Sequence, residues 1–585
     1  MYTLIILFLV CPVWVLLIEA VHRRGFLPAF RWMINRPFFF LINVVFVYGL
    51  VLPAAVFTGR VIIASCAVFL VFFILVVISS FKHFARNEPL YFFDLLLAFK
   101  IAGVTGSSNL AVTPVLMVAA AVGAGSLVGV FLLIPAELLF ADRFVAVIAF
   151  VVAMILSLFE KKKDVTYLTK GFLYGFVHNT GGYFKKPVPP VVESPVLELP
   201  VVEPVLQADS TKGVSRTSAS HKLPNVIVIL SESFFDLTRV PELELSEDPL
   251  PFFRALKNRA VTGTLLVTPI GGGTCAVESE FLTGIAERHI NSAKPFYYYL
   301  SKRQVPSLAT YFKGFGYEVH AVHTYNKSFY NRENAFRNMG FDTFTGAEDL
   351  RFADKDGFYI SDAELTNQIF RLYGAKTAPA FLMGISMENH QPYTPAKYPE
   401  TDIKILNTKE FSDRTGKRLI QEAETYLHGL RHGDRELKRL VAYVDSQNEP
   451  TVLLFFGDHL GTVGRELEFY RRLGYIGRDE GYLSPMDVGR MYSPDFLMVS
   501  NFKTERSHFE RVGANFLPVV LLDYLEMPKS GLFGVLDEVF PRLRCISRHD
   551  IYCDGAGGML TGLPTELREL ELRLQVAEFA AMGMG

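Results

Sequence analysis

The chain has 585 residues, half of them hydrophobic, and a mean hydropathy of +0.27, which is high for a wholly soluble protein. Charged residues make up only 20% of the sequence, and this composition excludes a disordered or fibrous protein. The formal net charge is −1, so nothing in the charge favours nucleic acid as a partner. Five cysteines are too few for a disulfide scaffold or a multi-zinc module.

The hydrophobic residues gather in the N-terminal part of the chain. Five mostly apolar segments there have the length of about 20 residues that crosses roughly 30 Å of hydrocarbon. They are residues 3–20, 38–57, 61–79, 112–135 and 143–159. No small-residue cleavage site follows the first segment, which argues against a removed signal peptide. We therefore predict a bundle of five transmembrane helices, with helices buried in a soluble core as the alternative.

Two further segments belong to this half of the chain. Residues 87–100 are apolar but interrupted by charges and a proline, which favours an interfacial helix lying on the membrane over an ordinary loop helix. Residues 187–204 contain six prolines and predict a semi-rigid spacer. The rest of the chain reads as a soluble domain large enough for one core.

Four short apolar runs in the soluble half each end abruptly in polar residues. The runs are 225–230, followed by Glu232; 317–322, followed by His323 to Asn326; 381–385, followed by Glu388, Asn389 and His390; and 451–456, followed by Asp458 and His459. Continuous apolar runs separated by longer helical segments predict a largely parallel sheet with helices on both faces. Ligands bind beyond the carboxyl ends of the strands in such sheets, so these polar residues should converge on one site.

Three consecutive glycines, residues 271–273, stand directly before Thr274. Glycines let the backbone approach a ligand closely, and a helix is expected to begin at Thr274. A hydroxyl at a helix N-terminus lies in a positive field that suits a phosphate. The alternative is that Thr274 only caps the helix.

Glu232, Asp458 and His459 combine two carboxylates with an imidazole at the ends of predicted strands. This set suits one divalent cation, Mn²⁺, Mg²⁺ or Zn²⁺. Such a cation lowers the pKa of a bound hydroxyl. Taken one at a time, each of these residues is as readily explained as a surface residue at a strand end as it is as a metal ligand.

Together these motifs resemble the lipoteichoic acid synthase family, within the sulfatase and alkaline phosphatase superfamily. Glu232 in NVIVILSES resembles the metal-binding glutamate of that family, and Thr274 in GGGTCAVESEFLTG resembles its threonine nucleophile. Asp458 and His459 in FFGDHLG resemble its remaining metal ligands. The five spans, the segment 87–100 and the linker match as well, so the resemblance extends over nearly the whole chain.

Two substrate-binding motifs of the family also have counterparts. Tyr330, Asn331 and Arg332 resemble an aromatic-Asn-Arg motif, with Tyr330 where the family frequently has tryptophan, and His390 in MENHQPY resembles a substrate-site histidine. A true sulfatase needs a modifiable Cys or Ser in a C-x-P-x-R context. Cys275 is not in that context, so sulfate-ester hydrolysis is not expected.

The resemblance implies an α/β sulfatase-like domain and one Mn²⁺-like ion, with Mg²⁺ or Zn²⁺ possible, held by Glu232, Thr274, Asp458 and His459. It also implies that Thr274 attacks the phosphorus of a phospholipid such as phosphatidylglycerol and passes phosphoglycerol to an extracytoplasmic glycan or glycolipid. Transfer of phosphoethanolamine to lipid A or a glycan is the alternative. A non-catalytic membrane receptor with a degenerate domain is a third hypothesis, disfavoured by the intact motif residues.

The expected organisation follows from this comparison. It comprises a transmembrane domain (1–165), a juxtamembrane segment and linker (166–223), a sulfatase-like catalytic domain (224–535) and a C-terminal segment packed on it (536–585). The family places the protein in a bacterial cytoplasmic membrane, multi-pass, with the catalytic domain outside. The loop charges predict the opposite orientation by the positive-inside rule. Interfacial lysines and arginines also contact anionic headgroups, so we follow the resemblance.

A few cysteines and histidines call for separate predictions. Cys545 and Cys553 have seven residues between them and can pair if the domain lies in an oxidising compartment; two free buried thiols are the alternative. His320 and His323 face opposite ways on a strand, so at most one points to the site, and neither is expected to be a ligand. His289 is expected in a loop, and residues 565–580 are expected to form a terminal helix docked on the sheet.

Overall fold

The computed structural model describes residues 2–23, 25–58, 61–86, 90, 95, 170–176, 222–290, 296–350, 352–464, 467–477, 484–547 and 550–584. They form two compact units, Met1–Lys186 with Ser292–Lys294, and Pro187–Asn291 with Pro295–Gly585. The predicted spans 112–135 and 143–159, nearly all of 87–100 and the proline-rich spacer lie outside the described residues.

The first unit contains helices over the first three predicted spans. They are α1 (Tyr2–His22), α2 (Phe26–Asn35), α3 (Pro37–Thr58) and α4 (Val61–Arg86). Within the described residues, only α4 is long and apolar enough to cross a membrane, over Ile63–Ser80. The pair α2 and α3, bent by 106°, counts as a second span if it is taken as one broken helix. The described part of the chain therefore supports one or two spans, and the predicted five are not established.

Buried polar side chains attach residues 170–176 to the helices of this unit. Glu19 of α1 accepts a hydrogen bond of 2.9 Å from Arg23 Nε and one of 2.5 Å from the backbone N of Phe172. Asn43 of α3 donates to the backbone O of Lys170 at 2.7 Å and accepts from the backbone N of Tyr174 at 2.9 Å. Buried backbone groups that lack a partner are costly, so these two side chains fix where the segment lies.

The second unit is built on an eight-stranded mixed sheet of order β10-β2-β9-β8-β1-β7-β3-β4. Its strands are β1 (Asn225–Ser231), β2 (Val261–Leu266), β3 (Glu318–His323), β4 (Thr343–Thr345), β7 (Ala380–Ile385), β8 (Thr451–Gly457), β9 (Asp495–Ser500) and β10 (Ser507–Gly513). The four predicted strands are β3, β7, β1 and β8, which are adjacent and parallel. β9 runs antiparallel to both β8 and β2. The predicted α/β fold with a largely parallel sheet is confirmed for this unit.

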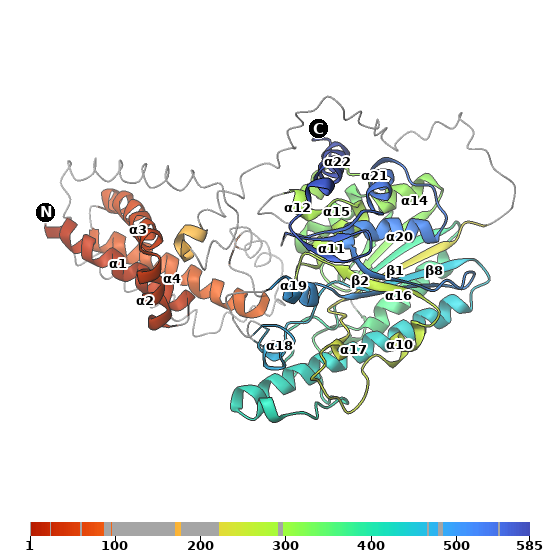
Figure 1. Cartoon of the computed structure of the whole chain (residues 1–585), viewed down its shortest axis with the longest axis horizontal. Helices are drawn as coiled ribbons and strands as arrows, with labels where there is room; N and C mark the ends of the chain where they lie inside the picture. Colours follow the sequence, from red (N-terminus) through yellow and green to blue (C-terminus); the bar gives the residue numbers. More distant parts are fainter. Residues whose placement is uncertain are drawn as a thin grey trace. The chain divides into compact units, whose positions relative to one another are not determined.

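Helices cover both faces of this sheet, as expected for strands that are buried on both sides (Figure 1). On one face lie α10 (Pro251–Leu256), α16 (Asp362–Ala375) and the long α17 (Arg414–Asp445). The other face carries α11 (Thr274–Thr283), α14 (Leu308–Gly314), α15 (Arg332–Asn338), α20 (Leu517–Tyr524) and α21 (Gly531–Val539). Shorter helices are α12 (Glu287–Ile290), α13 (Tyr297–Leu300), α18 (Glu468–Arg472) and α19 (Pro485–Met491). Every residue of β1, β7, β8 and β9 is buried, so the core lies in the centre of the sheet.

The C-terminal segment forms a small sheet and a last helix. β11 (Leu543–Ile546), β12 (Ile551–Asp554) and β13 (Met559–Thr561) are antiparallel, and α22 (Thr565–Ala581) packs against α21. Cys545 and Cys553 stand opposite each other on β11 and β12, with Cα atoms 4.6 Å apart, and form a disulfide. The predicted pairing is confirmed, and so is a terminal helix over residues 565–580, but this helix packs against α21 and not on the sheet as expected.

The prediction that His289 lies in a loop is wrong. His289 belongs to α12 and is buried, with its Nδ1 2.5 Å from Glu578 Oε2 of α22. Burial alone lowers the pKa of this imidazole, but the carboxylates of Glu578 and Glu571 outweigh it and raise the pKa to about 9. The sequence around His289 is polar enough to suggest a loop, whereas the partner that buries it lies 289 positions further along the chain.

Candidate active site

Glu232 and Ser233 follow directly after β1 and mark one side of the site. The backbone N of Glu232 donates to Ser386 Oγ at 2.9 Å, which joins this turn to the one after β7. Ser233 has a left-handed backbone, φ 54°, an uncommon conformation for a residue with a Cβ. Its Oγ donates to Glu232 Oε1 at 2.8 Å, so the turn presents the glutamate carboxylate from a fixed position.

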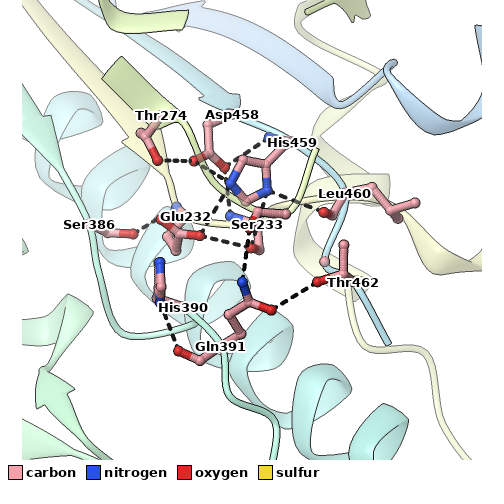
Figure 2. Close-up of polar contacts among 12 residues, drawn as sticks. Glu232, Ser233, Thr274, Ser386, His390, Gln391, Asp458, His459, Leu460 and Thr462 are labelled. Carbon is pink, nitrogen blue, oxygen red and sulfur yellow. Dashed lines mark hydrogen bonds and ion pairs between the residues drawn. The ribbon is translucent and has the colours of Figure 1, made fainter. Parts of the chain in front are cut away.

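Asp458 and His459 follow β8, the strand beside β1, and face the same space (Figure 2). Asp458 Oδ1 accepts hydrogen bonds from the backbone N of Ser233 at 2.7 Å and from that of His459 at 2.8 Å. The two strand ends are therefore joined through one carboxylate. His459 Nε2 lies 3.2 Å from Asp458 Oδ2 and 3.6 Å from Glu232 Oε1.

Thr274 is the first residue of α11, and Gly273 occupies the N-cap position. The three glycines before it all have positive φ values, 63°, 137° and 90°, which other residues rarely adopt. The Thr274 hydroxyl does not cap the helix: its Oγ1 donates to Asp458 Oδ2 at 2.8 Å. The capping alternative is thus not what the structure shows, and the hydroxyl points at the two strand ends (Figure 2).

Glu232, Asp458 and His459 meet the requirements of a cation site. One ligand atom from each lies within 4.8 Å of the others, and all three side chains are buried. Among the described residues, His459 Nε2 has no hydrogen-bond partner. Burial and the neighbouring Asp458 raise the pKa of Glu232 well above its usual range. Two buried carboxylates and an orphaned imidazole nitrogen are stabilised by a divalent cation, so these residues fit one.

Arg332 starts α15 and is held by a buried carboxylate. Its Nε donates to both oxygens of Glu278 at 3.2 and 3.1 Å, and its Nη2 donates to Oε1 at 2.5 Å. The Tyr297 hydroxyl donates a fourth hydrogen bond to the same carboxylate, at 2.6 Å. Arg332 Nη1 is buried and has no hydrogen-bond partner among the described residues. One edge of the guanidinium is thus fixed, while the other keeps a donor for an anion.

The two residues before Arg332 have an unusual backbone. Tyr330 and Asn331 are both left-handed, with φ of 56° and 61°, and the Arg332 guanidinium carbon lies 5.3 Å from the centre of the Tyr330 ring. Consecutive non-glycine residues in this region are strained, and such strain gathers at functional sites. The structure therefore places Tyr330 against the guanidinium.

His390 lies in the turn after β7, next to a residue that contacts both the glycine segment before Thr274 and the segment after β8. Its neighbour Gln391 donates to the backbone O of Gly271 at 2.9 Å and accepts from Thr462 at 2.9 Å. His390 Nδ1 is 2.7 Å from the backbone O of Gln391, and the His390 carbonyl accepts from Lys397 Nζ at 2.9 Å. β7 and β1 are parallel neighbours, so His390 and Glu232, which follow these strands, lie at the same end of the sheet (Figure 2).

Sequence reasoning missed several residues of this site. Ser233, Glu278, Tyr297 and Lys397 are buried polar residues that contact or surround the predicted ones. Glu278 had a usable signal, since it stands one helical turn after Thr274 and so shares a face with it. The others become recognisable only when distant segments are brought together. His323 is the buried histidine of β3 and His320 the outer one, consistent with opposite directions.

The comparisons with known proteins agree with this fold. Residues 224–492 match the Sulfatase family. A protein of Rhizobium meliloti named for cyclic β-1,2-glucan modification is 30% identical over 56% of this chain and 49% of its own length. Lipoteichoic acid synthase of Staphylococcus saprophyticus is 27% identical over 25% of this chain and 22% of its own. The chain thus spans half or less of these two relatives.

Among solved structures, the phosphoglycerol transferase GacH of Streptococcus pyogenes is similar with a TM-score of 0.49 and 20% identity, covering 61% of this chain and 86% of that one. The relationship predicted from the motifs is confirmed. Residues 224–492 of this chain match the Sulfatase family, and lipoteichoic acid synthases are among the relatives that the chain resembles.

Proposed function

We propose that the protein is a membrane-anchored transferase that moves phosphoglycerol from phosphatidylglycerol to an extracytoplasmic glycan or glycolipid through a threonine-linked intermediate. The observation that carries the proposal is the hydrogen bond from Thr274 Oγ1 to Asp458 Oδ2, within a buried set of cation-ligating side chains. A free threonine hydroxyl is a poor nucleophile near neutral pH and needs activation by neighbouring groups. A threonine hydroxyl placed among cation-ligating side chains is therefore a candidate nucleophile.

The transfer proceeds in two displacements at phosphorus. Thr274 Oγ, as an alkoxide whose proton has been released to solvent, forms a bond to phosphorus, while the bond from phosphorus to the diacylglycerol oxygen breaks; it leaves again as the alkoxide in the second step. That oxygen takes a proton from His390, which leaves diacylglycerol and a phosphoglyceryl ester of Thr274. An acceptor hydroxyl then gives its proton to His390 and displaces Thr274, so each step exchanges one ester for another.

The residues around the hydroxyl support this chemistry. Glu232, Thr274, Asp458 and His459 would hold the divalent cation, with Mn²⁺ preferred over Mg²⁺ or Zn²⁺ on the family resemblance. When bound, it makes the threonine hydroxyl more acidic and offsets negative charge on the phosphoryl oxygens. The free Nη1 of Arg332 would bind a phosphoryl oxygen, and Tyr330 would hold the guanidinium plane. The N-terminus of α11 adds further positive field at Thr274.

An oligosaccharide is the acceptor that the relatives favour. The Rhizobium protein is named for modification of a cyclic β-1,2-glucan, and another relative from that organism, 27% identical, is named for capsular polysaccharide biosynthesis. A glycan outside the cytoplasm requires the catalytic domain, residues 224–535, to lie there as well. The disulfide Cys545–Cys553 is consistent with such an oxidising compartment.

The deciding experiment incubates the purified full chain with phosphatidylglycerol labelled in its headgroup and no acceptor. We expect label on a peptide containing Thr274, and its loss when a glucan is added. Thr274→Ser keeps the hydroxyl and should retain some turnover, whereas Thr274→Ala should have none. Labelled phosphatidylethanolamine in a parallel reaction tests the other headgroup, and transfer only from that lipid would replace the donor. Normal turnover in Thr274→Ala would overturn the mechanism.

Location is tested separately. A reporter fused after Lys222 should show alkaline phosphatase activity if residues 224–535 lie outside the cytoplasm. Green fluorescence from a cytoplasmic reporter, with no phosphatase activity, would contradict the proposed orientation and support the loop charges.

A further inference from the structure

A second cluster of metal-ligating side chains lies outside the site described above. It consists of Asp356 at the end of β5 (Lys355–Asp356), Glu388 in the turn after β7, and His432 of α17. One ligand atom from each lies within 4.8 Å of the others. His432 Nδ1 is 2.5 Å from Glu388 Oε1 and 3.1 Å from Asp356 Oδ2. Glu388 and His432 are buried, whereas the Asp356 side chain is 39% exposed, so solvent reaches the cluster from one side.

Two buried polar atoms beside this cluster have no hydrogen-bond partner among the described residues. Asp362, the first residue of α16, is only 6% exposed, and its Oδ1 makes no hydrogen bond there. Its backbone N donates to Glu388 Oε2 at 2.7 Å, which places it against the cluster. The hydroxyl of Tyr398, 2% exposed, likewise makes no hydrogen bond, and its ring centre lies 5.7 Å from that of His432.

The charges of the cluster are unbalanced. Three carboxylates, those of Asp356, Asp362 and Glu388, lie around one imidazole, that of His432. Burial raises the pKa of Asp362 well above its usual range, with the charge of Glu388 adding to it, and burial raises that of Glu388 to about 7. Lys397 donates to the His390 carbonyl, and its charge offsets part of the carboxylate charge at Glu388. Such a group of carboxylates must take up protons or a cation.

We propose that Asp356, Glu388 and His432 form a second divalent-cation site, with the Asp362 carboxylate beside it. A neutral imidazole and ionised carboxylates are the forms that coordinate metals, and one nitrogen with two or three oxygens suits Zn²⁺ or Mn²⁺. The orphaned Asp362 oxygen is what this site adds to a plain hydrogen-bonded cluster.

The site would stiffen the turn that carries His390. Asp356 belongs to a hairpin whose second strand, β6 (Tyr359–Ile360), presents Tyr359 to that turn. Tyr359 donates to the backbone O of Gln391 at 2.8 Å, and its hydroxyl is 3.3 Å from His390 Nδ1. A cation bound to the hairpin, the turn and α17 therefore holds the three together. The inference concerns ion binding alone and does not depend on the proposed transferase activity.

The test counts metal ions on the purified full chain. The protein is stripped with chelator, equilibrated with Zn²⁺ or with Mn²⁺, separated from free ion and measured by elemental analysis. We expect two equivalents on the wild-type chain with at least one of the two ions. Asp458→Asn should lose only the metal ion bound at the Glu232 site. His432→Gln should lose only the metal ion bound at the second site. Asp356→Asn, on a half-exposed hairpin where misfolding is not expected, should weaken one binding step by at least about tenfold.

A matched control comes from a neighbouring carboxylate. Asp402 is 57% exposed and lies 3.9 Å from His428, outside the cluster, so Asp402→Asn should keep both equivalents. A wild-type chain that binds neither ion, or whose number of bound equivalents is undiminished in both His432→Gln and Asp356→Asn, would overturn the second site. A failure at Asp458→Asn alone would instead concern the Glu232 site and its proposed function.

Discussion

The buried pair of Arg332 and Glu278 allows a quantitative prediction. Arg332 is 2% exposed and Glu278 is fully buried, and three hydrogen bonds join them. Glu278→Gln keeps the shape but leaves one acceptor oxygen and turns an amide donor toward a guanidinium that only donates. Removing one partner of a buried ion pair costs about 3–5 kcal/mol. Because glutamine still accepts one hydrogen bond, we expect the free energy of unfolding to fall by an amount at the lower end of this range, about 3 kcal/mol.

The measurement is urea denaturation of the full chain in detergent, followed by circular dichroism. Both tryptophans, Trp14 and Trp32, lie in the first unit, so tryptophan fluorescence reports that unit alone and should be unchanged. Arg259 and Asp445 are a matched exposed pair at 2.7 Å, each about two-fifths exposed, and Asp445→Asn should cost less than about 1 kcal/mol.

A double-mutant cycle completes the test. Adding Arg332→Gln to Glu278→Gln removes the uncompensated charge, so the double variant should be less destabilised than the two single losses added together. It should nevertheless remain inactive, since the anion-binding donor is gone. A loss for Glu278→Gln as small as that for Asp445→Asn would refute the reasoning that this pair positions the guanidinium.

Three further predictions concern packing, pH and the disulfide. Gly429→Ala places a Cβ 2.0 Å from Asn389 Oδ1 and should destabilise by about 1–3 kcal/mol, whereas Gly374→Ala, with open space around it, should be neutral or slightly stabilising in the same urea assay. The pKa of His289 is raised to about 9 from an unfolded value near 6.5, so its stabilisation is complete below pH 6.5 and is lost as pH rises through 9. The stability difference between wild type and His289→Gln should fall by about 3 kcal/mol over that range, and a flat difference would contradict the pairing. Reduction of the C-terminal disulfide should cost about 2–3 kcal/mol for its short loop, and equal alkylation of both thiols without reductant would show that the bond is absent.

The central strands were predictable because their signal is local. β1, β7 and β8 are buried on both faces and so read as continuous apolar runs, while β3 is fully buried only over its last three residues; each is followed by polar residues that reach the site. β10 was missed because its residues alternate between half-buried and exposed, and its pairing with β2 carries a register shift. The C-terminal hairpin was anticipated only through its two cysteines.

The candidate site divides in the same way. Glu232, Thr274, Asp458 and His459 could be named from residue type and from position at predicted strand ends. That the Thr274 hydroxyl reaches Asp458 rather than capping its own helix depends on Gly273 taking the cap position, which local pattern does not distinguish. The position of Glu278 one turn after Thr274 was a usable signal, but its pairing with Arg332 and the second cluster were not recognisable, because the partners stand 54 and 44 positions away.

The sequence by itself therefore determined the α/β class of the second unit, its relationship to sulfatases and the residues around which chemistry is expected, since each rests on short contiguous patterns. Only the tertiary structure decided which side chains pair, that Arg332 is held by Glu278, that His289 is buried against Glu578, and that Asp356, Glu388 and His432 meet. The physical reason is that burial and charge pairing are properties of contacts between distant segments. The same side chain is solvated or desolvated according to what the fold brings against it.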